Sequence, residues 1–402
     1  MAGPAWTRRE VIRSGPQDAS ARLGRHGQSP REGSPMSPVP VAALTAAAYT
    51  IPTDAPEADG TFAWDSTTIV VVQATAGDAT GLGYTYGPPA LVSFIQELLE
   101  PAVRGMDALA VPACAEAMSR ALRNAGQSGA GAYAQSAVDC ALWDLAARTH
   151  GVALHTLLGA ARTEVPVYGS GGFTSYSAEQ LTDQLTDWVQ GQGIPRVKIK
   201  IGQDRGTSVA RDIDRMLLAR ETIGNEAELF VDANGAYTPK QAVRVLDAAR
   251  DARITWFEEP VSSENLEGLR LVRGGIAADV AAGEYLTRVA DAQRMCASGA
   301  VDCLQADVTR CGGITGWLRV AAVARAHGLG FSGHCAPALS AAPAAAAPEL
   351  RHLEWFHDHT RLEAMLFDGT LDPSGGTITP DPDMPGNGLV FRSADAEKYR
   401  VL

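Results

Sequence analysis

The sequence lacks the segments that would carry a protein into or across a membrane. None of its apolar runs reaches the roughly 20 residues that a transmembrane helix needs. The pair Arg8-Arg9 is followed by no apolar segment, so it does not form an export signal. The six cysteines contain no Cys-x-x-Cys pair. We therefore expect a soluble protein with reduced thiols and a cytoplasmic location.

Positive charge is also scarce. The 34 lysine and arginine residues are outnumbered by 46 aspartate and glutamate residues, which gives a formal charge of −12. This acidity argues against nucleic acids and anionic membranes as partners, because both carry charge of the same sign. Only four lysines occur, and two of them, Lys198 and Lys200, are separated by a single residue. With 46% hydrophobic residues over 402 positions, the chain has enough apolar side chains for one large core or two smaller ones.

The pattern of apolar residues divides the chain into four segments. Residues 1–38 are rich in proline, glycine, serine and arginine and are predicted to be disordered. Residues 39–163 combine a β-branched strand with an amphipathic helix at 134–148, which predicts an α+β unit. Residues 164–359 repeat a short apolar run, a polar residue and a helical stretch, which is typical of an α/β barrel. Residues 360–402 break this rhythm and are predicted to return to the first unit. The eight apolar runs are 165–169, 197–201, 229–232, 255–258, 280–284, 303–307, 329–334 and 352–355.

Three acidic residues end consecutive strands of the predicted barrel. Asp232, Glu258 and Glu284 follow one another at intervals of 26 residues, so we expect their side chains to converge at one rim. Three carboxylates together would repel one another unless a cation neutralised them, and ligation by carboxylates alone favours Mg²⁺ or Mn²⁺ over Zn²⁺. Each acid by itself could equally be a solvated loop residue or the partner of an arginine. Three of them at matched strand ends favour a Mg²⁺ site.

The two neighbouring lysines lie in the alternating run Val197-Lys-Ile-Lys-Ile201, which places both ammonium groups on one face of a strand. Inside a barrel, each lysine would lower the pKa of the other by repulsion. Lys200 could then accept a proton near neutral pH as a general base. The alternative is an exposed edge strand whose lysines extend into solvent.

Further polar residues follow the later strands. Asp307 and His334 lie 27 residues apart at successive strand ends. A carboxylate beside an imidazole fixes its tautomer and raises its basicity, which makes His334 a second candidate base. A lone histidine is more often structural, but the neighbouring carboxylate favours the catalytic interpretation. Glu354, 20 residues after His334, is a candidate general acid if Trp355 raises its pKa.

With these residues in place, the chain resembles the enolase superfamily and, within it, the mandelate racemase subgroup. The resemblance covers about residues 46–390. Its motifs follow the order of the family: Ala137-Val-Asp-Cys-Ala-Leu-Trp-Asp-Leu145, Leu157-Leu-Gly159, Lys198-x-Lys200, Val231-Asp-Ala-Asn234, Phe257-Glu-Glu-Pro260, Gly283-Glu284, Asp307-x-x-x-x-Gly312-Gly313-x-x-Gly316, His334 and Glu354.

The resemblance implies both a fold and a reaction. The fold is a modified TIM barrel, (β/α)7β, with an α+β capping domain formed by the N-terminal region and the C-terminal tail. One Mg²⁺ per subunit is held by Asp232, Glu258 and Glu284 and stabilises the enediolate that forms when the α-proton of a carboxylate substrate is removed. The implied catalytic roles are Lys200 as a base on one face of the substrate, the His334/Asp307 pair on the other face, Lys198 in contact with the substrate carboxylate, and Glu354 as a hydrogen-bond donor to it.

The same catalytic set fits two reactions of a 2-hydroxy acid. Loss of the α-proton is followed by β-elimination of water in a sugar acid dehydratase, which is a lyase, or by return of the proton in a racemase or epimerase. The resemblance also implies that loops of the capping domain determine specificity, here the segment 52–64 and the region of residues 84–89. The segment 52–64 carries Asp54, Glu57 and Asp59 but no basic residue, which disfavours a second substrate carboxylate there and favours recognition of hydroxyl groups. We therefore expect dehydration of a sugar acid, with racemisation or epimerisation as the alternative. Some aromatic residues would instead fit an aryl pocket, although they also stack on sugars or simply pack: Phe62, Trp64, Tyr84 and Tyr86.

Two other classes of protein stay open. One is a Schiff-base aldolase on the same barrel, with Lys200 as the nucleophile and no need for metal. The other is a non-catalytic metabolite-binding protein with the same fold. The expected partner is a small-molecule carboxylate, with no nucleic acid and no membrane, and we expect a homo-oligomer between a dimer and an octamer. For Cys335, next to His334, packing is the default interpretation.

Overall fold

The computed structural model describes residues 38–402, and three long antiparallel strands come first. Disorder is predicted for residues 1–38. Of these only Pro38 belongs to the described residues, so the prediction falls outside the part of the chain that the structure describes. Side chains of the middle strand alternate between two layers of the core, since Val70 and Val72 pack in one and Ile69 and Val71 in the other. The sheet has the order β1 (Ala43–Ala58), β2 (Ala63–Ala76), β3 (Ala79–Tyr86).

Helices pack against this sheet, and the longest of them, α4 (Ala130–His150), runs along β3 and β2. It begins four residues before the predicted helix at 134–148 and ends two residues after it. Gly81 and Gly83 of β3 permit the close approach, because a Cβ atom would lie 2.1 Å from the Ala141 carbonyl at the first position and 2.3 Å from the Ala137 carbonyl at the second. The other helical segments of this region are α1 (Leu91–Phe94), η1 (Ile95–Leu99), α2 (Glu100–Val103), α3 (Val111–Ala121) and α5 (Leu154–Leu158).

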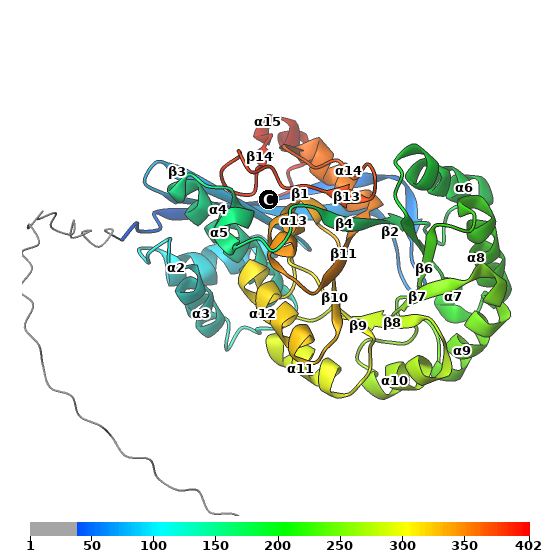
Figure 1. Cartoon of the computed structure of the whole chain (residues 1–402). Coiled ribbons are helices and arrows are strands. Elements are labelled where there is room, and N and C mark those ends of the chain that lie inside the picture. The colour runs from blue at the N-terminus through cyan, green and yellow to red at the C-terminus, as the bar shows by residue number, and fades with distance from the viewer. Residues whose placement is uncertain (1–37) are drawn as a thin grey trace, which may run out of the picture. The chain divides into compact units, whose positions relative to one another are not determined.

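Eight parallel strands form a closed barrel in the second half of the chain (Figure 1). Each strand pairs with the next one in sequence, and the last pairs with the first, where Glu354 lies opposite Tyr168. The predicted runs match these strands to within two residues at either end. The strands are β4 (Val165–Gly171), β5 (Arg196–Lys200), β6 (Glu228–Asp232), β7 (Ile254–Glu258), β8 (Asp279–Ala282), β9 (Cys303–Ala306), β10 (Gly330–Gly333) and β11 (Leu350–Phe356).

Helices follow the barrel strands and form the outer ring seen in Figure 1. In α9 (Pro239–Ala248), Thr238 and Gln241 form a capping box, Pro239 takes the first turn, and Ala242 and Val245 face the core. This arrangement fixes where the helix starts and which face it buries. The remaining helical segments are α6 (Ala178–Thr186), η2 (Asp187–Gly191), α7 (Gln203–Gly206), α8 (Val209–Ile223), η3 (Arg250–Ala252), α10 (Leu266–Gly275), α11 (Val289–Ala297), α12 (Gly313–Ala326) and α13 (Pro337–Ala346).

The C-terminal tail returns to the N-terminal sheet. The Val401 amide donates to the Ala48 carbonyl at 2.9 Å, and the Ala48 amide donates to the Leu402 carbonyl at 3.0 Å. The fold is therefore the predicted modified TIM barrel with an α+β cap. The segment boundaries after residues 163 and 359 stay predictions, since residues 38–402 form one compact unit. One short strand of the tail pairs antiparallel with β4 of the barrel instead. The tail contains α14 (His357–Leu366), β12 (Phe367–Asp368), β13 (Thr377–Ile378), which makes that pairing, β14 (Val390–Phe391), α15 (Ser393–Ala396) and η4 (Glu397–Tyr399).

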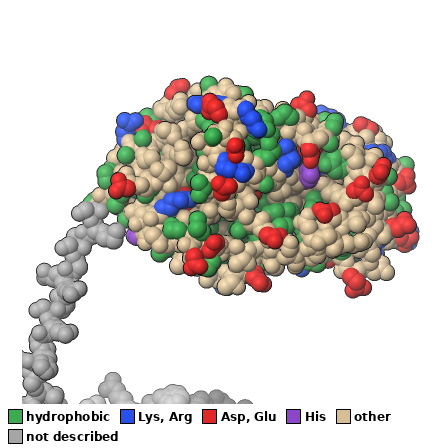
Figure 2. All heavy atoms as spheres, turned by 90° about the horizontal axis from the view of Figure 1, so that it is seen from above, with side chains coloured by type: hydrophobic (Ala, Val, Ile, Leu, Met, Phe, Trp, Pro, Cys, Tyr) green, Lys and Arg blue, Asp and Glu red, His purple; other side chains and the backbone are tan. Residues whose placement is uncertain are grey.

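Between residues 38 and 402, no helix combines the length and the apolar character that crossing a bilayer requires. All six cysteines are buried free thiols, as expected. On the face shown in Figure 2, basic and acidic side chains are interspersed.

Candidate active site

Three carboxylates converge at the carboxyl-terminal rim of the barrel. Asp232 and Glu258 are the last residues of β6 and β7, and Glu284 lies two residues beyond β8. All three are buried, and one oxygen from each lies within 4.8 Å of the other two. Oε2 of Glu284 accepts no hydrogen bond from the described residues. Because buried carboxylate oxygens need a compensating charge or donor, this all-oxygen set fits a hard divalent cation such as Mg²⁺.

The loops that carry these carboxylates are held by local backbone features. The amide of Asn234, a residue with φ of 46°, donates to Oδ1 of Asp232 at 2.8 Å. Gly283 precedes Glu284 with φ of 139°, and a Cβ atom there would lie 2.1 Å from the Gln305 carbonyl. Only glycine permits this close passage, which brings Glu284 beside the next strand.

The two lysines of β5 point into the barrel at the same rim. Lys198 is fully buried, and its Nζ lies 2.5 Å from Oε1 of Glu258 and 2.8 Å from Oε1 of Glu354. Nζ of Lys200 lies 2.5 Å from Oδ2 of Asp232. Since β5 pairs with β4 on one side and β6 on the other, the alternative of an exposed edge strand is wrong.

The expected lowering of the pKa of Lys200 is not found. Burial lowers the pKa of this ammonium, and Lys198 adds repulsion, but the combined attraction of Asp232, Glu354 and Glu284 outweighs both, so that the pKa lies above its ordinary value. The sequence places the two lysines on one face of the strand. It does not show that each ammonium lies against a carboxylate of a neighbouring strand.

The predicted pair of Asp307 and His334 is formed. Asp307 directly follows β9 and His334 directly follows β10, and Nδ1 of the imidazole lies 2.8 Å from Oδ2 of the carboxylate. Because the carboxylate accepts, Nδ1 carries the proton and Nε2 faces the site. Nε2 lies 3.4 Å from Oε2 of Glu284 and 3.5 Å from Oε2 of Glu354. Burial lowers the pKa of His334. Glu284, Glu354 and Asp307 together raise it by more than burial lowers it, so the pKa lies above its ordinary value.

Glu354 is an acceptor in this arrangement. Its Oε1 accepts from Oγ of Ser170 at 2.6 Å, and its Oε2 accepts from the amide of Cys335 at 3.2 Å. Burial raises the pKa of Glu354, but Lys198 and His334 lower it well below the usual range. The expectation that Trp355 raises this pKa is wrong, because adjacent residues of a strand point to opposite faces.

Cys335 does more than pack. Its Sγ lies 3.3 Å from Nε2 of His334 and 3.4 Å from Oε2 of Glu354, and its backbone has φ of 49°. The thiol therefore touches the candidate base and the candidate acid together.

All eight residues expected at the site are joined by contacts of 3.6 Å or less. Their roles as ligands, bases and acid stay predictions.

Four other residues at the site have no role in the sequence interpretation. Ser170 and Gln305 are inward-facing strand residues that the same alternation could have identified, and Trp256 lies two residues before Glu258. Arg310 lies in a loop without a spacing signal, 3.2 Å from Asp307 and 3.3 Å from Glu284.

The capping segment 52–64 covers the site as the end of a hairpin, where the sequence indicated a loop. β1 and β2 continue through it, with a bulge between Pro52 and Glu57. Trp64 lies edge-on to Phe173 at 5.6 Å and packs in the same cluster as Cys335. The hairpin end thus lies against the candidate active site.

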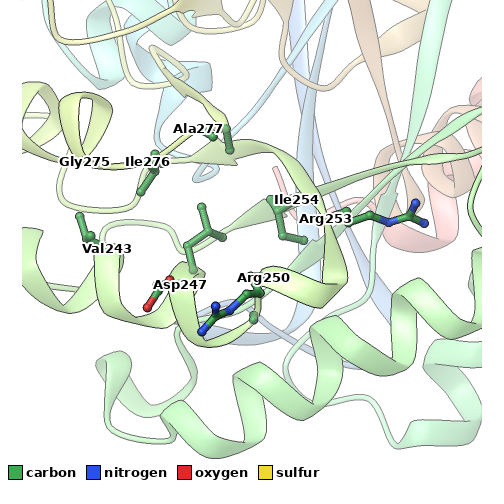
Figure 3. Close-up of a pocket in the computed structure, with 11 residues that line it drawn as sticks. Val243, Asp247, Arg250, Arg253, Ile254, Gly275, Ile276 and Ala277 are labelled. Carbon is green, nitrogen blue, oxygen red and sulfur yellow. The ribbon is translucent and has the colours of Figure 1, made fainter.

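A pocket at the other end of the barrel is not part of this site. It lies between α9 and α10, where Ile254 and Ala278 mark the amino ends of β7 and β8 (Figure 3). Barrel enzymes carry their chemistry at the carboxyl ends of the strands, where the carboxylates and lysines lie.

Comparison with known families matches most of the chain. The family described as "Mandelate racemase / muconate lactonizing enzyme, N-terminal domain" matches residues 48–159. The family described as "Enolase C-terminal domain-like" matches residues 180–396. The relatives of the chain include acid-sugar dehydratases, cycloisomerases and epimerases.

Three individual proteins illustrate the similarity. A mandelate racemase/muconate lactonizing enzyme-like protein from Rubrobacter xylanophilus is 52% identical, with a TM-score of 0.87 over 90% of this chain and 100% of that one. The D-galactarolactone cycloisomerase of Agrobacterium fabrum is 28% identical over 87% of this chain and 95% of its own. The L-talarate/galactarate dehydratase of Salmonella typhimurium, liganded with Mg and L-lyxarohydroxamate, is 26% identical, with a TM-score of 0.84 over 95% of this chain and 98% of that one.

Proposed function

The chain belongs to the mandelate racemase/muconate lactonizing enzyme family of the Mg²⁺-dependent enolase superfamily, and we propose that it is an acid-sugar dehydratase. It would remove the α-proton of a 2-hydroxy carboxylate and then eliminate water. The observation that supports this proposal is that Lys200 lies beside Asp232 and His334 lies beside Glu284, two different members of the cluster of three carboxylates.

Asp232, Glu258 and Glu284 are the residues that would hold the cation. When bound, Mg²⁺ supplies positive charge that stabilises the extra negative charge on the substrate carboxylate as the α-proton leaves. Lys198 lies within 2.8 Å of both Glu258 and Glu354, so its ammonium stands where it can attract the same carboxylate. The chain carries a net negative charge, but the cation and the Lys198 ammonium would supply buried positive charge that attracts an acidic substrate.

The two bases come from opposite parts of the barrel. Lys200 ends β5, whereas His334 follows β10, which lies three strands away through β11 and β4. A substrate between them presents one face to each. If Asp232 held the cation, its attraction for the Lys200 ammonium would weaken. Burial and repulsion from Lys198, which both act to lower the pKa of Lys200, would then favour the free amine that takes the α-proton.

His334 is suited to the second step. Burial lowers its pKa, but Glu284, Glu354 and Asp307 together raise it more, which stabilises the protonated form of the imidazole. Nε2 can then give its proton to the departing 3-hydroxyl group, so that water leaves and the enediolate electrons form the double bond of an enol. The enol then rearranges to a 2-keto-3-deoxy acid, so the overall reaction is the loss of one water molecule from the substrate.

The same two bases also fit racemisation or epimerisation, and this is the second candidate. One base would take the α-proton and the other would return one from the opposite face. The substrate decides between the two reactions, because elimination requires a 3-hydroxyl group. Relatives of the chain are known for both types of reaction.

The test is the product formed from a broad set of sugar acids and aryl 2-hydroxy acids with Mg²⁺. A dehydratase gives a 2-keto-3-deoxy acid, which keto-specific reagents detect, and consumes its substrate completely. Accumulation of an equilibrium mixture of two epimers, with no keto acid, would favour the second candidate and contradict the first. Turnover of either kind should disappear in Lys200→Ala and His334→Ala.

A further inference from the structure

A second group of metal-ligating side chains lies where the capping hairpin meets the barrel. Asp54 and Glu57 come from the bulged part of β1, and His357 begins α14 directly after β11. One ligand atom from each of the three lies within 4.8 Å of the other two. Nε2 of His357 lies 3.0 Å from Oδ2 of Asp54, although 303 residues separate them in the sequence. The group therefore joins two distant segments through side chains of types that bind metals.

Glu57 is the member that indicates a ligand. Its side chain is only 1% exposed, and Nε1 of Trp64 donates to its Oε2 at 2.8 Å. Its Oε1, in contrast, has no hydrogen-bond partner among residues 38–402. A buried polar atom without a partner costs free energy, so this oxygen requires a donor or a cation that the protein itself does not supply.

The charges around Glu57 are mostly negative. Burial and then repulsion from Asp358 raise the pKa of Glu57 to about 9. The nearby guanidinium of Arg361 is engaged by Asp358 at 2.7 Å. With this pKa the Glu57 carboxyl group holds a proton at neutral pH. A divalent cation would displace that proton, satisfy the free oxygen and offset the repulsion between Glu57 and Asp358.

We propose that Asp54, Glu57 and His357 form a second divalent-cation site, separate from the site of the three barrel carboxylates. One imidazole nitrogen with two carboxylates suits a borderline cation such as Zn²⁺ better than Mg²⁺. Asp54 and His357 are partly exposed, with 46% and 26% of their side-chain surfaces accessible, so the cation can enter and keep water ligands. Small side-chain movements would bring the ligand atoms to bonding distance.

This site would fasten the hairpin that covers the candidate active site. The hairpin end reaches the carboxyl ends of β5 and β6, since a Cβ atom at Gly60 would lie 2.7 Å from the Ile201 carbonyl and 2.8 Å from the Ala233 carbonyl. Within the protein, a hydrogen bond already connects β1 with α14, because Nη2 of Arg361 donates to the Pro52 carbonyl at 2.9 Å. A cation at the proposed site would strengthen the connection between the same two segments.

The test is a titration of the full chain with Zn²⁺ while excess Mg²⁺ saturates the barrel carboxylates, followed by calorimetry and by the thermal midpoint of unfolding. The wild-type protein should bind one Zn²⁺ per chain and unfold at a higher temperature with Zn²⁺ than without it. Both effects should be lost in Glu57→Gln and in His357→Gln. They should persist in Asp65→Asn, which removes an exposed acid from the same hairpin.

Two results would overturn this proposal. One is the absence of Zn²⁺ binding in a wild-type protein whose circular dichroism shows it to be folded. The other is binding that survives in both Glu57→Gln and His357→Gln. The group formed by His334, Cys335 and Glu354 could also take Zn²⁺. An ion that is lost only in Cys335→Ser would lie there and would equally contradict the proposed site.

Discussion

Lys198 lies against three carboxylates at the site. Its fully buried ammonium contacts the carboxylates of Glu258 and Glu354 at 2.5 and 2.8 Å, and that of Asp232 at 3.6 Å. Removing one partner of a buried ion pair leaves the other charges uncompensated. The lysine therefore serves stability as well as substrate binding.

Lys198→Met is expected to lower the free energy of unfolding by about 3–5 kcal/mol in the absence of Mg²⁺. Saturating Mg²⁺ should recover part of this loss, because the cation replaces the positive charge beside Glu258. Urea unfolding with EDTA and with Mg²⁺ measures both values. Lys240→Met, at an exposed position of α9, is the matched control and should change stability little. Equal losses in the two variants would contradict the role given to Lys198.

Asp307 acts through His334. It accepts from Nδ1 of the imidazole and also from the amide and hydroxyl of Thr309, at 2.7 and 2.6 Å, which hold it in place. Asp307→Asn replaces the charged acceptor of the imidazole by a neutral amide, which holds Nδ1 less firmly, and the pKa of His334 falls because the hydrogen bond to a carboxylate that raised it is weakened. We expect turnover to fall by about 10²–10⁴-fold.

The pH profile distinguishes this role from a structural one. Since the protonated imidazole is the proposed proton donor, its lower pKa in Asp307→Asn should shift the alkaline limb of the profile to lower pH. A rate that falls with an unchanged profile would show that the variant merely perturbs the fold.

At the scale of elements, the contact between α4 and α12 depends on a buried carboxyl group. Oδ1 of Asp139 accepts from the amide of Thr315 at 2.9 Å, in the first turn of α12, whereas its Oδ2 has no partner in the described part of the chain. Burial raises the pKa of Asp139 to about 7. The folded chain therefore holds a proton here at a pH where the unfolded chain has lost it.

This difference predicts a pH dependence of stability. Because the pKa of Asp139 is higher in the folded chain than in the unfolded chain, its contribution to the free energy of unfolding is fully present below about pH 4. This contribution is lost as the pH rises to about 7. The slope is at most about 1.4 kcal/mol per pH unit for one proton. Asp139→Asn keeps the shape and the acceptor, so its stability should decline less than that of the wild type between these values. Parallel curves from chemical unfolding at several pH values would contradict this prediction.

Close packing of β3 on α4 gives a prediction about a glycine. In Gly83→Ala, the new Cβ atom would lie 2.3 Å from the Ala137 carbonyl and 2.5 Å from the Ala141 amide nitrogen, both of which belong to the backbone of α4. We expect a loss of about 1–3 kcal/mol, because the two elements must move apart. Gly274→Ala in α10, where no atom lies within 4 Å of the new methyl group, should not destabilise the protein. A thermal midpoint for Gly83→Ala equal to that of the wild type would contradict this description of the packing.

Elements with strong local signals could be predicted from the sequence. The eight apolar runs correspond to the barrel strands, because a buried parallel strand is short, apolar and followed by a helix. The resemblance to the family predicts that segment 52–64 is a loop of the capping domain, yet it continues β1 and β2 through a bulge. Contacts with the barrel hold it there, including the hydrogen bond from Thr174 to the Ala58 carbonyl. Such long-range contacts leave no local pattern in the sequence.

At the scale of the whole molecule, the order of strands around the barrel determines which side chains meet. Equal spacing of Asp232, Glu258 and Glu284 predicts their convergence because each strand, loop and helix has a similar length. The pKa values could not be predicted in this way. They depend on which ammonium lies against which carboxylate, as the pairs of Lys200 with Asp232 and of Lys198 with Glu354 illustrate.

The central claim concerns the proton α to the substrate carboxylate, and it is tested most directly by exchange of that proton in D2O. With Mg²⁺ and a 2-hydroxy acid substrate, NMR should show deuterium at the α-carbon of recovered substrate. The 2-keto-3-deoxy product of dehydration has no hydrogen at that carbon and should carry deuterium at C3, where the enol takes up a solvent proton. EDTA should abolish the exchange, Lys200→Ala should abolish exchange from one configuration, and His334→Ala should abolish it from the other. Exchange or turnover that persists in EDTA, or that is unaffected by loss of both Lys200 and His334, would contradict the proposed function.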